Sequence, residues 1–247
     1  MKKTTGVLMA LEQEAFSVFG KRGWSESGGF LAKAERIGQK VFLIVISGPG
    51  PKRVQRATHY LLACDSSPII NIGVAGALAE DLEAGDVLCP SLIKSEEGAL
   101  DMDSSQRLQL EKVLRPSGVP LTKGNLFTAL RVIASPEEKK RLHEIHSCQA
   151  VDMEAYHCGA ECLRENVPFF AIKAISDRAN ESLPGAITSC VDDKGRVRLS
   201  RLILSILSRP WLIPRLLELQ ESFKKATYSL ELAMSAIGAH PFGVFSD

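Results

Sequence analysis

Five short apolar segments constrain the fold of this chain more than any other feature of its sequence. They lie at residues 5–11, 41–46, 68–72, 86–92 and 169–175. Glycine, proline or polar residues bound these segments, and helical spacing of apolar residues follows at 15–19 and 53–63. Continuous apolar runs between helices are typical of strands buried on both faces of a parallel sheet. The sequence therefore predicts an α/β fold, a single domain spanning 1–247 with a central, mostly parallel mixed sheet flanked by helices.

Two segments between these strands also carry structural predictions. Residues 95–118 are polar and are expected to form an excursion on the surface. A helix is expected to begin at Asp152-Met153-Glu154, shortly before the last of the apolar strands.

The last part of the chain, residues 191–247, is rich in leucine and isoleucine at helical spacing and is predicted to be a helical C-terminal extension. Pro210 and Pro214 interrupt the pattern, which predicts a helix, a break and a second helix. Six basic residues and no acidic residue lie at 194–215. Two interpretations stay open. The helices pack on the sheet, or the basic, apolar break around Trp211 contacts a membrane surface or borders an apolar substrate.

Composition excludes several classes of protein. A net charge of +1 over 247 residues gives no reason to expect a nucleic-acid partner. The sequence has no apolar span of about 20 residues, the length a transmembrane helix needs. The basic start meets Glu12 and Glu14, unlike a secretory signal. Six scattered cysteines without a CxxC pair are typical of reduced thiols in the cytoplasm. The spacing of His143, His146 and Cys148 matches no strong zinc pattern, so neither a metal nor a cofactor is expected.

Carboxylates follow two of the predicted strands and begin a predicted helix. Glu12 and Glu14 come after the first strand, Asp152 and Glu154 start the helix, and Asp177 follows the late strand. Since ligands bind at the carboxyl ends of parallel strands, these groups can meet in one pocket. Such a pocket suits cleavage of a glycosidic bond, in which one carboxyl protonates the leaving group and another activates water. Carboxylates at helix starts are also common for dipole reasons, so the pattern alone leaves the function open.

Five segments, in this order, resemble the nucleoside phosphorylase/nucleosidase superfamily, and above all the 5′-methylthioadenosine/S-adenosylhomocysteine nucleosidases. They are ALEQE (10–14), SGPGPKRVQRA (47–57), NIGVAGALAEDLEAGDV (71–87), VDMEA (151–155) and AIKAISDRAN (171–180). The resemblance implies that Glu14 activates the attacking water and that Asp177 donates a proton towards N7 of the purine. It also implies that Ser176 orients Asp177.

The same resemblance implies a set of residues that bind the nucleoside. Glu154 would accept hydrogen bonds from the ribose hydroxyls, with Met153 beside it. Gly76 would line the nucleoside, and Ile133 falls where a residue of the family contacts the base. Related enzymes are often dimers, so the resemblance also implies a homodimer.

The nucleophile is expected to be water rather than phosphate. Phosphorylases of this superfamily resemble one another in a Gly-Asp-Pro-x-Arg loop after the first strand and in an arginine near the third. This chain has ALEQEAF and NIGVAGAL at those places. Lys52 and Arg53 remain as alternative phosphate ligands. An anion beside Glu14 would be repelled, most strongly in a site of low dielectric constant.

Differences from the sequence pattern of the thioadenosine enzymes suggest which substrate this chain binds. Val74 stands where they have a small polar residue, and Val132 where they have an aromatic one. Residues 191–219 resemble the branch called hopanoid-associated phosphorylases, which implies release of adenine from adenosylhopane and leaves ribosylhopane. A lipid-linked nucleoside further implies peripheral contact with the inner membrane. The alternatives are a methylthioadenosine/S-adenosylhomocysteine or futalosine nucleosidase, a purine nucleoside phosphorylase, and a nucleoside-binding module without catalysis.

Overall fold

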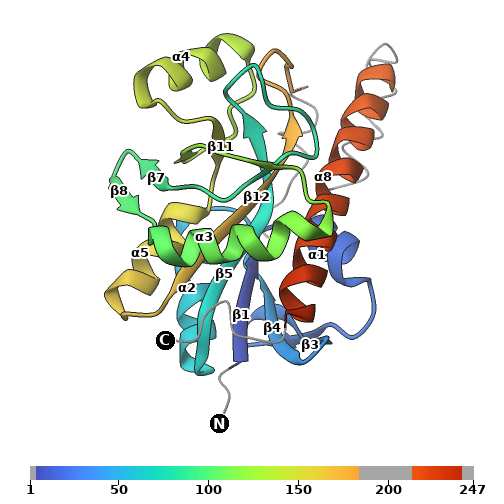
Figure 1. Cartoon of the computed structure of the whole chain (residues 1–247), viewed down its shortest axis with the longest axis vertical. Coiled ribbons are helices and arrows are strands. Elements are labelled where there is room, and N and C mark those ends of the chain that lie inside the picture. Colours follow the sequence, from blue (N-terminus) through green and yellow to red (C-terminus); the bar gives the residue numbers. More distant parts are fainter. Residues whose placement is uncertain (1–3, 184–212, 241–247) are drawn as a thin grey trace.

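A long mixed sheet runs through the middle of the computed structural model, which describes residues 4–183 and 213–240 (Figure 1). Its main path is β2 (Ser25–Ser27), β3 (Phe30–Ile37), β4 (Lys40–Ile46), β1 (Thr4–Met9), β5 (Ser66–Ala77), β11 (Ala150–Asp152), β10 (Leu126–Thr128), β7 (Leu92–Ser95) and β8 (Gly98–Asp101). Beside β5 lies β12 (Phe169–Asp177), followed by β6 (Val87–Leu88) and β9 (Leu121–Thr122).

The pairing of the strands is parallel in the centre of this sheet. β1 pairs in parallel with both β4 and β5, and β12 pairs in parallel with β5. Antiparallel pairs occur towards the edges, as between β3 and β4, and where β11 meets β5. The carboxyl ends of β1, β5 and β12 therefore lie at the same edge of the sheet.

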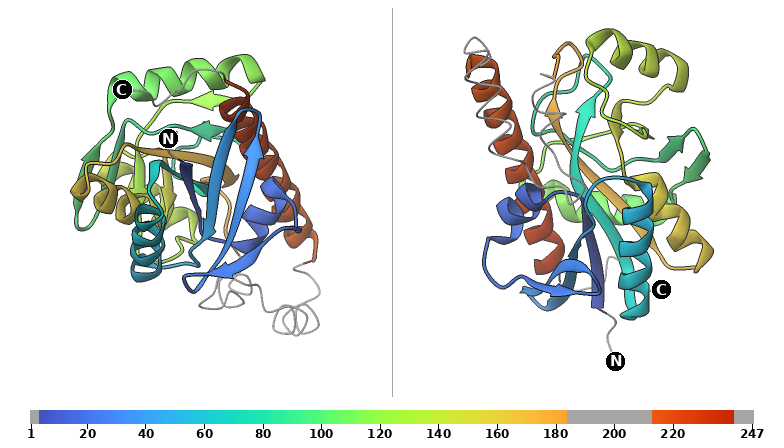
Figure 2. Two further views of the ribbon diagram at one scale, coloured as in Figure 1. Left: turned by 90° about the horizontal axis from the view of Figure 1, so that it is seen from below. Right: turned by 180° about the vertical axis from the view of Figure 1, so that it is seen from behind.

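Helices cover both faces of the sheet, as Figure 2 shows. One face carries α1 (Glu12–Phe19), α3 (Ser104–Leu114) and α8 (Ile213–Ala239), and the other carries α2 (Pro51–Ala63) and α5 (Ala155–Arg164). The helix α4 (Pro136–His146) and the 3₁₀ turn Arg115–Ser117 complete the helices of the described ranges.

Strand β1 shows why the sequence is apolar without alternation. Side chains of a strand point alternately to opposite faces. Val7 and Met9 accordingly pack in the core beneath α1 and α8, while Leu8 packs in the core beneath α2. All three are fully buried. A strand covered on both faces needs apolar residues at every position, which confirms the predicted layered α/β fold.

Two local predictions from the sequence are wrong. The stretch 95–118 is not only a surface excursion, because it contains α3, whose Leu110 and Leu114 are buried in the main core. Two leucines four residues apart form a narrow apolar stripe, which the polar composition of the stretch conceals. The helix does not begin at Asp152 either. Asp152 is the last residue of β11, and α5 begins at Ala155.

The described part of the C-terminal extension is the helix α8. Its buried face includes Ala226, Leu230 and Ile237, which pack on the main core. Pro214 lies in the first turn of α8, where a proline is tolerated because its missing N–H has no helical partner. The rest of the predicted extension, with the break around Trp211, lies outside the described residues. No helix in the described ranges is both long and apolar enough to cross a membrane.

Candidate active site

Glu14 is a buried carboxyl at the carboxyl end of β1. It lies in the first turn of α1, and only 3% of the residue is exposed. Its Oε1 accepts a hydrogen bond from Val74 N of β5 at 3.1 Å, and its Oε2 accepts one from Leu11 N at 3.2 Å. Burial raises the pKa of Glu14, although the hydrogen bond from Val74 and the charge of Lys173 oppose this rise. The carboxyl is thus held rigidly in a site where it binds a proton more readily than in water.

Lys173 provides a positive charge next to this carboxyl. It lies in the middle of β12, in register with Gly73 of β5, and is 1% exposed. Its Nζ forms an ion pair with Asp152 Oδ2 at 2.8 Å. Burial disfavours its ammonium form, but the nearby negative charges of Asp152, Glu154 and Glu14 outweigh burial and raise the pKa of Lys173. Lys173 was not predicted from the sequence, although a lysine within an apolar strand is a signal of a buried, paired charge.

Replacing Lys173 by methionine should destabilise the protein by about 3–5 kcal/mol at neutral pH, because the carboxyls around it lose their counter-ion. These carboxyls would then be protonated at a higher pH in the folded state than in the unfolded state. The loss of stability should therefore shrink as the pH falls from about 8 towards about 5. Urea unfolding at several pH values measures this. Replacing the exposed Lys52 by methionine is the control, and a loss that does not change with pH would contradict the prediction.

Glu154 lies beside Lys173, immediately before α5. It is 8% exposed, and its Oε2 accepts a hydrogen bond from Met153 N at 3.3 Å. Burial raises the pKa of Glu154 to about 8, and the charges of Asp152 and Glu14 add to this rise while Lys173 opposes it. A carboxyl that is mostly protonated at neutral pH can both donate a hydrogen bond and accept one, as neighbouring hydroxyl groups of a sugar require.

Asp177 ends β12 and is held from two sides. It is 5% exposed. Ser176 Oγ donates a hydrogen bond to Asp177 Oδ1 at 2.8 Å, and Lys139 Nζ of α4 lies 2.5 Å from Asp177 Oδ2. The contact with Ser176 is the one expected of a residue that orients this carboxyl. Lys139 was not identified from the sequence.

Two glycines of β5 mark the places of Glu14 and Asp177. A Cβ atom on Gly73 would lie 3.3 Å from Glu14 Oε2, and one on Gly76 would lie 3.0 Å from Asp177 Oδ2. Three residues of an extended strand span about 10 Å. Glu14 and Asp177 therefore contact positions about 10 Å apart along the same strand. Glu154 and Lys173 lie near Glu14. The structure thus brings together the acidic residues predicted from distant parts of the sequence.

The other two predicted binding residues lie at the margin of this group. Met153 is partly buried next to Glu154. Ile133 is 7% exposed and packs in a small core cluster with Val151. A Cβ on Gly76 would lie 3.5 Å from Val151 Cγ1. Ile133 is therefore adjacent to the Gly76 and Asp177 side of the site through Val151.

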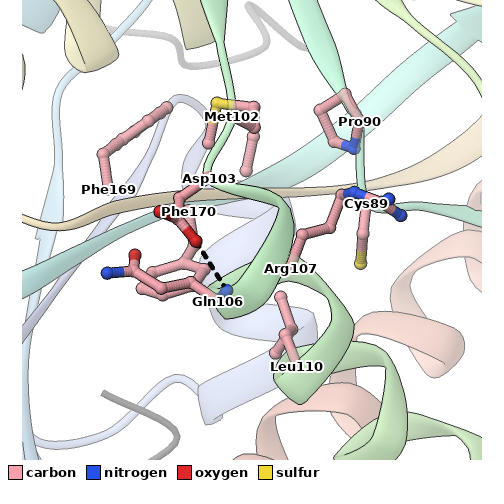
Figure 3. A pocket seen from close by; sticks show the side chains of 10 residues that line it. Cys89, Pro90, Met102, Asp103, Gln106, Arg107, Leu110, Phe169 and Phe170 are labelled. Atoms are coloured by element: carbon pink, nitrogen blue, oxygen red, sulfur yellow. Dashed lines mark hydrogen bonds between the residues drawn. The ribbon is translucent and has the colours of Figure 1, made fainter. Parts of the chain in front are cut away.

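A small pocket lies elsewhere, at the opposite end of β12 (Figure 3). It is formed around the start of α3, where Asp103 Oδ1 accepts a hydrogen bond from Gln106 N at 2.8 Å, and its floor includes Phe169 and Phe170. Phe170 is seven residues from Asp177 along an extended strand, a separation of about 23 Å. Neither Asp177 nor Glu14 nor Glu154 is among the residues that line this pocket. Among the described residues, no group of three or more His, Cys, Asp or Glu side chains is arranged to hold a metal ion.

Comparison with known proteins identifies the family. The family model described as "Phosphorylase superfamily" matches residues 6–208. The chain belongs to the phosphorylase superfamily. Among curated proteins, this superfamily member is similar to the 5′-methylthioadenosine/S-adenosylhomocysteine nucleosidase of Staphylococcus aureus (strain JH9). The two are 26% identical over 187 residues, which cover 67% of this chain and 82% of that protein.

Two solved structures share the fold of this chain. The 5′-methylthioadenosine/S-adenosylhomocysteine nucleosidase of Neisseria meningitidis, in complex with methylthio-immucillin-A, matches with a TM-score of 0.73 and 20% identity over 96% of this chain and 99% of that chain. The futalosine hydrolase of Helicobacter pylori strain 26695 matches with a TM-score of 0.70 and 18% identity, over 94% and 97%. These likenesses confirm the predicted fold class.

Proposed function

We propose that this protein cleaves the N-glycosidic bond of a 5′-substituted adenine nucleoside, with water as the nucleophile and adenine as the leaving group. The observation that carries the proposal is that two buried, hydrogen-bonded carboxyls, Glu14 and Asp177, contact positions about 10 Å apart along the same strand, β5. A ribose and a purine base fit a separation of this size, with the ribose towards Glu14 and the base towards Asp177. The similarity to a methylthioadenosine/S-adenosylhomocysteine nucleosidase supports the same substrate class.

In this proposal each charged side chain has a distinct role. Glu14, as a carboxylate, accepts a proton from water while the water oxygen bonds to the anomeric carbon. The bond from that carbon to the base breaks, and its electron pair stays with adenine. Asp177, as the protonated acid, donates its proton to N7 of the departing base and becomes a carboxylate, so that the base leaves without a full negative charge. Glu154 binds the ribose hydroxyls, and the surrounding carboxylates stabilise the positive charge that develops on the sugar.

Charge around Glu14 favours water over phosphate as the nucleophile. The nearest described cation is Lys173, which already pairs with Asp152 at 2.8 Å and also lies among Glu14 and Glu154. Arg53, the alternative phosphate ligand, donates a hydrogen bond from Nε to Ser47 O at 2.8 Å and thus fixes the loop before α2. A phosphate dianion would meet uncompensated negative charge at this site.

The finer proposal concerns the 5′ substituent, which we assign to a large apolar group as in adenosylhopane. It is supported by Val74, which is partly buried on β5 and whose backbone N–H contacts Glu14, and by Val132, which is 40% exposed. The resemblance of residues 191–219 to hopanoid-associated enzymes adds to it. The second candidate is a methylthioadenosine/S-adenosylhomocysteine or futalosine nucleosidase, which the relatives favour.

Release of free base from a panel of nucleosides tests both levels of the proposal. The purified protein is incubated with adenosylhopane, methylthioadenosine, S-adenosylhomocysteine, futalosine and inosine, each with and without inorganic phosphate. Phosphate-independent release of adenine supports hydrolysis. Strict dependence on phosphate would identify a phosphorylase, and binding without release would identify a nucleoside-binding module. Adenine from methylthioadenosine but not from adenosylhopane would overturn the lipid assignment.

The proposal extends to partners and location. We assign the chain to a cytoplasmic homodimer that contacts the inner membrane peripherally through its C-terminal extension. Light scattering coupled to gel filtration measures the oligomer. Sedimentation with anionic phospholipid vesicles, for the full chain and for its Trp211→Ala variant, measures the contribution of the predicted break around Trp211. Equal sedimentation of the two would contradict the membrane contact.

A further inference from the structure

Lys139 is a fully buried lysine outside the group of charges around Lys173. It lies in the second turn of α4 and is 0% exposed. Lysine is almost never buried without a partner, because removing an ammonium group from water is costly. Its neighbour on the same helix, Lys140, is exposed. The burial of Lys139 therefore calls for a physical reason.

All hydrogen-bonding capacity of the Lys139 ammonium is used at the end of β12. Its Nζ contacts Asp177 Oδ2 at 2.5 Å, Arg178 O at 2.7 Å and Glu181 O at 3.1 Å. A lysine has three donors, and these three acceptors match them. One ammonium group thus fixes both the Asp177 carboxyl and the chain that leaves the strand. Leu183 N, which donates to Ala134 O at 2.9 Å, attaches the same segment to the loop before α4.

The contact with Lys139 leaves Asp177 with little freedom. Ser176 donates a hydrogen bond to Oδ1 and Lys139 donates one to Oδ2, so each carboxyl oxygen is held by a different donor. A buried ion pair is weak evidence for a device that stabilises the fold, since apolar side chains of similar volume often stabilise as much or more. Lys139 pairs with the proposed proton donor. This contact is better explained by the negative charge that Asp177 acquires when it gives up its proton.

We propose that Lys139 is a positioning residue that acts through Asp177 during departure of the base. The inference rests on the proposed function. When the proton moves from Asp177 to N7, the electron pair of the O–H bond stays on Asp177, which becomes a carboxylate. The adjacent ammonium stabilises this negative charge as it forms and keeps its own protons. Lys139 therefore matters only when the leaving group needs a proton.

The leaving group provides the test. Lys139→Met is compared with wild type on two substrates, the adenine nucleoside that wild type cleaves and a 4-nitrophenyl riboside with the same 5′ substituent. Nitrophenolate leaves as an anion without being protonated, whereas adenine needs a proton at N7 to leave. We expect kcat to fall by about 100-fold on the nucleoside and by less than about 3-fold on the nitrophenyl riboside. Lys140→Met, the exposed neighbour, should change neither rate.

An equal loss on both substrates would overturn the inference, since it would show that Lys139 only maintains the fold of the site. The proposed function fails if wild type releases no base from any nucleoside. The inference about Lys139 alone fails if wild type releases base but the variant loses rate equally on both substrates.

A second variant covers the case in which Lys139→Met does not fold, because that change leaves the buried carboxyl of Asp177 without its partner. The double variant Lys139→Met/Asp177→Asn removes both ionisable groups and is compared with Asp177→Asn alone. Residues that act as a unit are not additive, so the two variants should have equal kcat on both substrates. A further loss in the double variant would contradict action through Asp177.

Discussion

Replacing Asp177 by asparagine should lower kcat for adenine release by about 10²- to 10⁴-fold, the usual contribution of a general acid. Asparagine has nearly the same shape and still accepts the hydrogen bond from Ser176 through its carbonyl oxygen, but it has no acidic proton for the base. The affinity for the nucleoside should change by less than about 3-fold, because shape and contacts persist. Single-turnover release of adenine and equilibrium binding of the nucleoside measure the two quantities.

The control for this variant is Asp101→Asn, a change on an exposed residue of the edge strand β8. Asp177→Asn also leaves Lys139 without its charge partner, so urea unfolding must show that the variant is folded under the assay conditions. Loss of affinity in proportion to the loss of rate would contradict the assignment of a chemical role, and it would favour a site that only binds the nucleoside.

Replacing Glu14 by glutamine should lower kcat by a similar factor, about 10²- to 10⁴-fold, because an amide cannot accept the proton of the attacking water. Burial raises the pKa of Glu14 in the wild type. As the base must be ionised, wild-type kcat should fall as the pH is lowered through this raised pKa. The residual activity of the variant should lack this acidic decline. A kcat profile against pH for both proteins checks the prediction.

Replacing Glu14 by glutamine also changes the hydrogen bonds that this side chain makes to the backbone. Both carboxyl oxygens of Glu14 accept hydrogen bonds from backbone N–H groups, those of Val74 and Leu11. The amide NH₂ of glutamine would face one of these donors, at a cost of about 1 kcal/mol if the contact at the start of α1 is lost. Gln13→Ala tests a change at the neighbouring position of the same helix. An unchanged acidic decline in the Glu14 variant would show that another group titrates.

The sequence determined the layered core and the acidic residues of the site. Strand β1 and strand β12 are apolar at successive positions because both faces of the sheet are covered, and this can be predicted from the sequence without knowing their neighbours. Glu14 and Asp177 follow directly from the places where these strands end. The helix α3 was harder to predict, because few residues of its polar stretch, such as Leu110 and Leu114, are buried in the main core.

Only the tertiary structure decided which lysines belong to the site. Lys173 has a signal in its apolar strand, but its three acidic neighbours come from β1–α1 and β11–α5, far away in sequence. Lys139 has no such signal, since it is one of two adjacent lysines on a polar helix, and only one of them is buried. Its partner Asp177 lies 38 residues away along the chain. Periodicity determines which face of a helix is apolar, whereas the burial of a single charge depends on what the rest of the chain places against it.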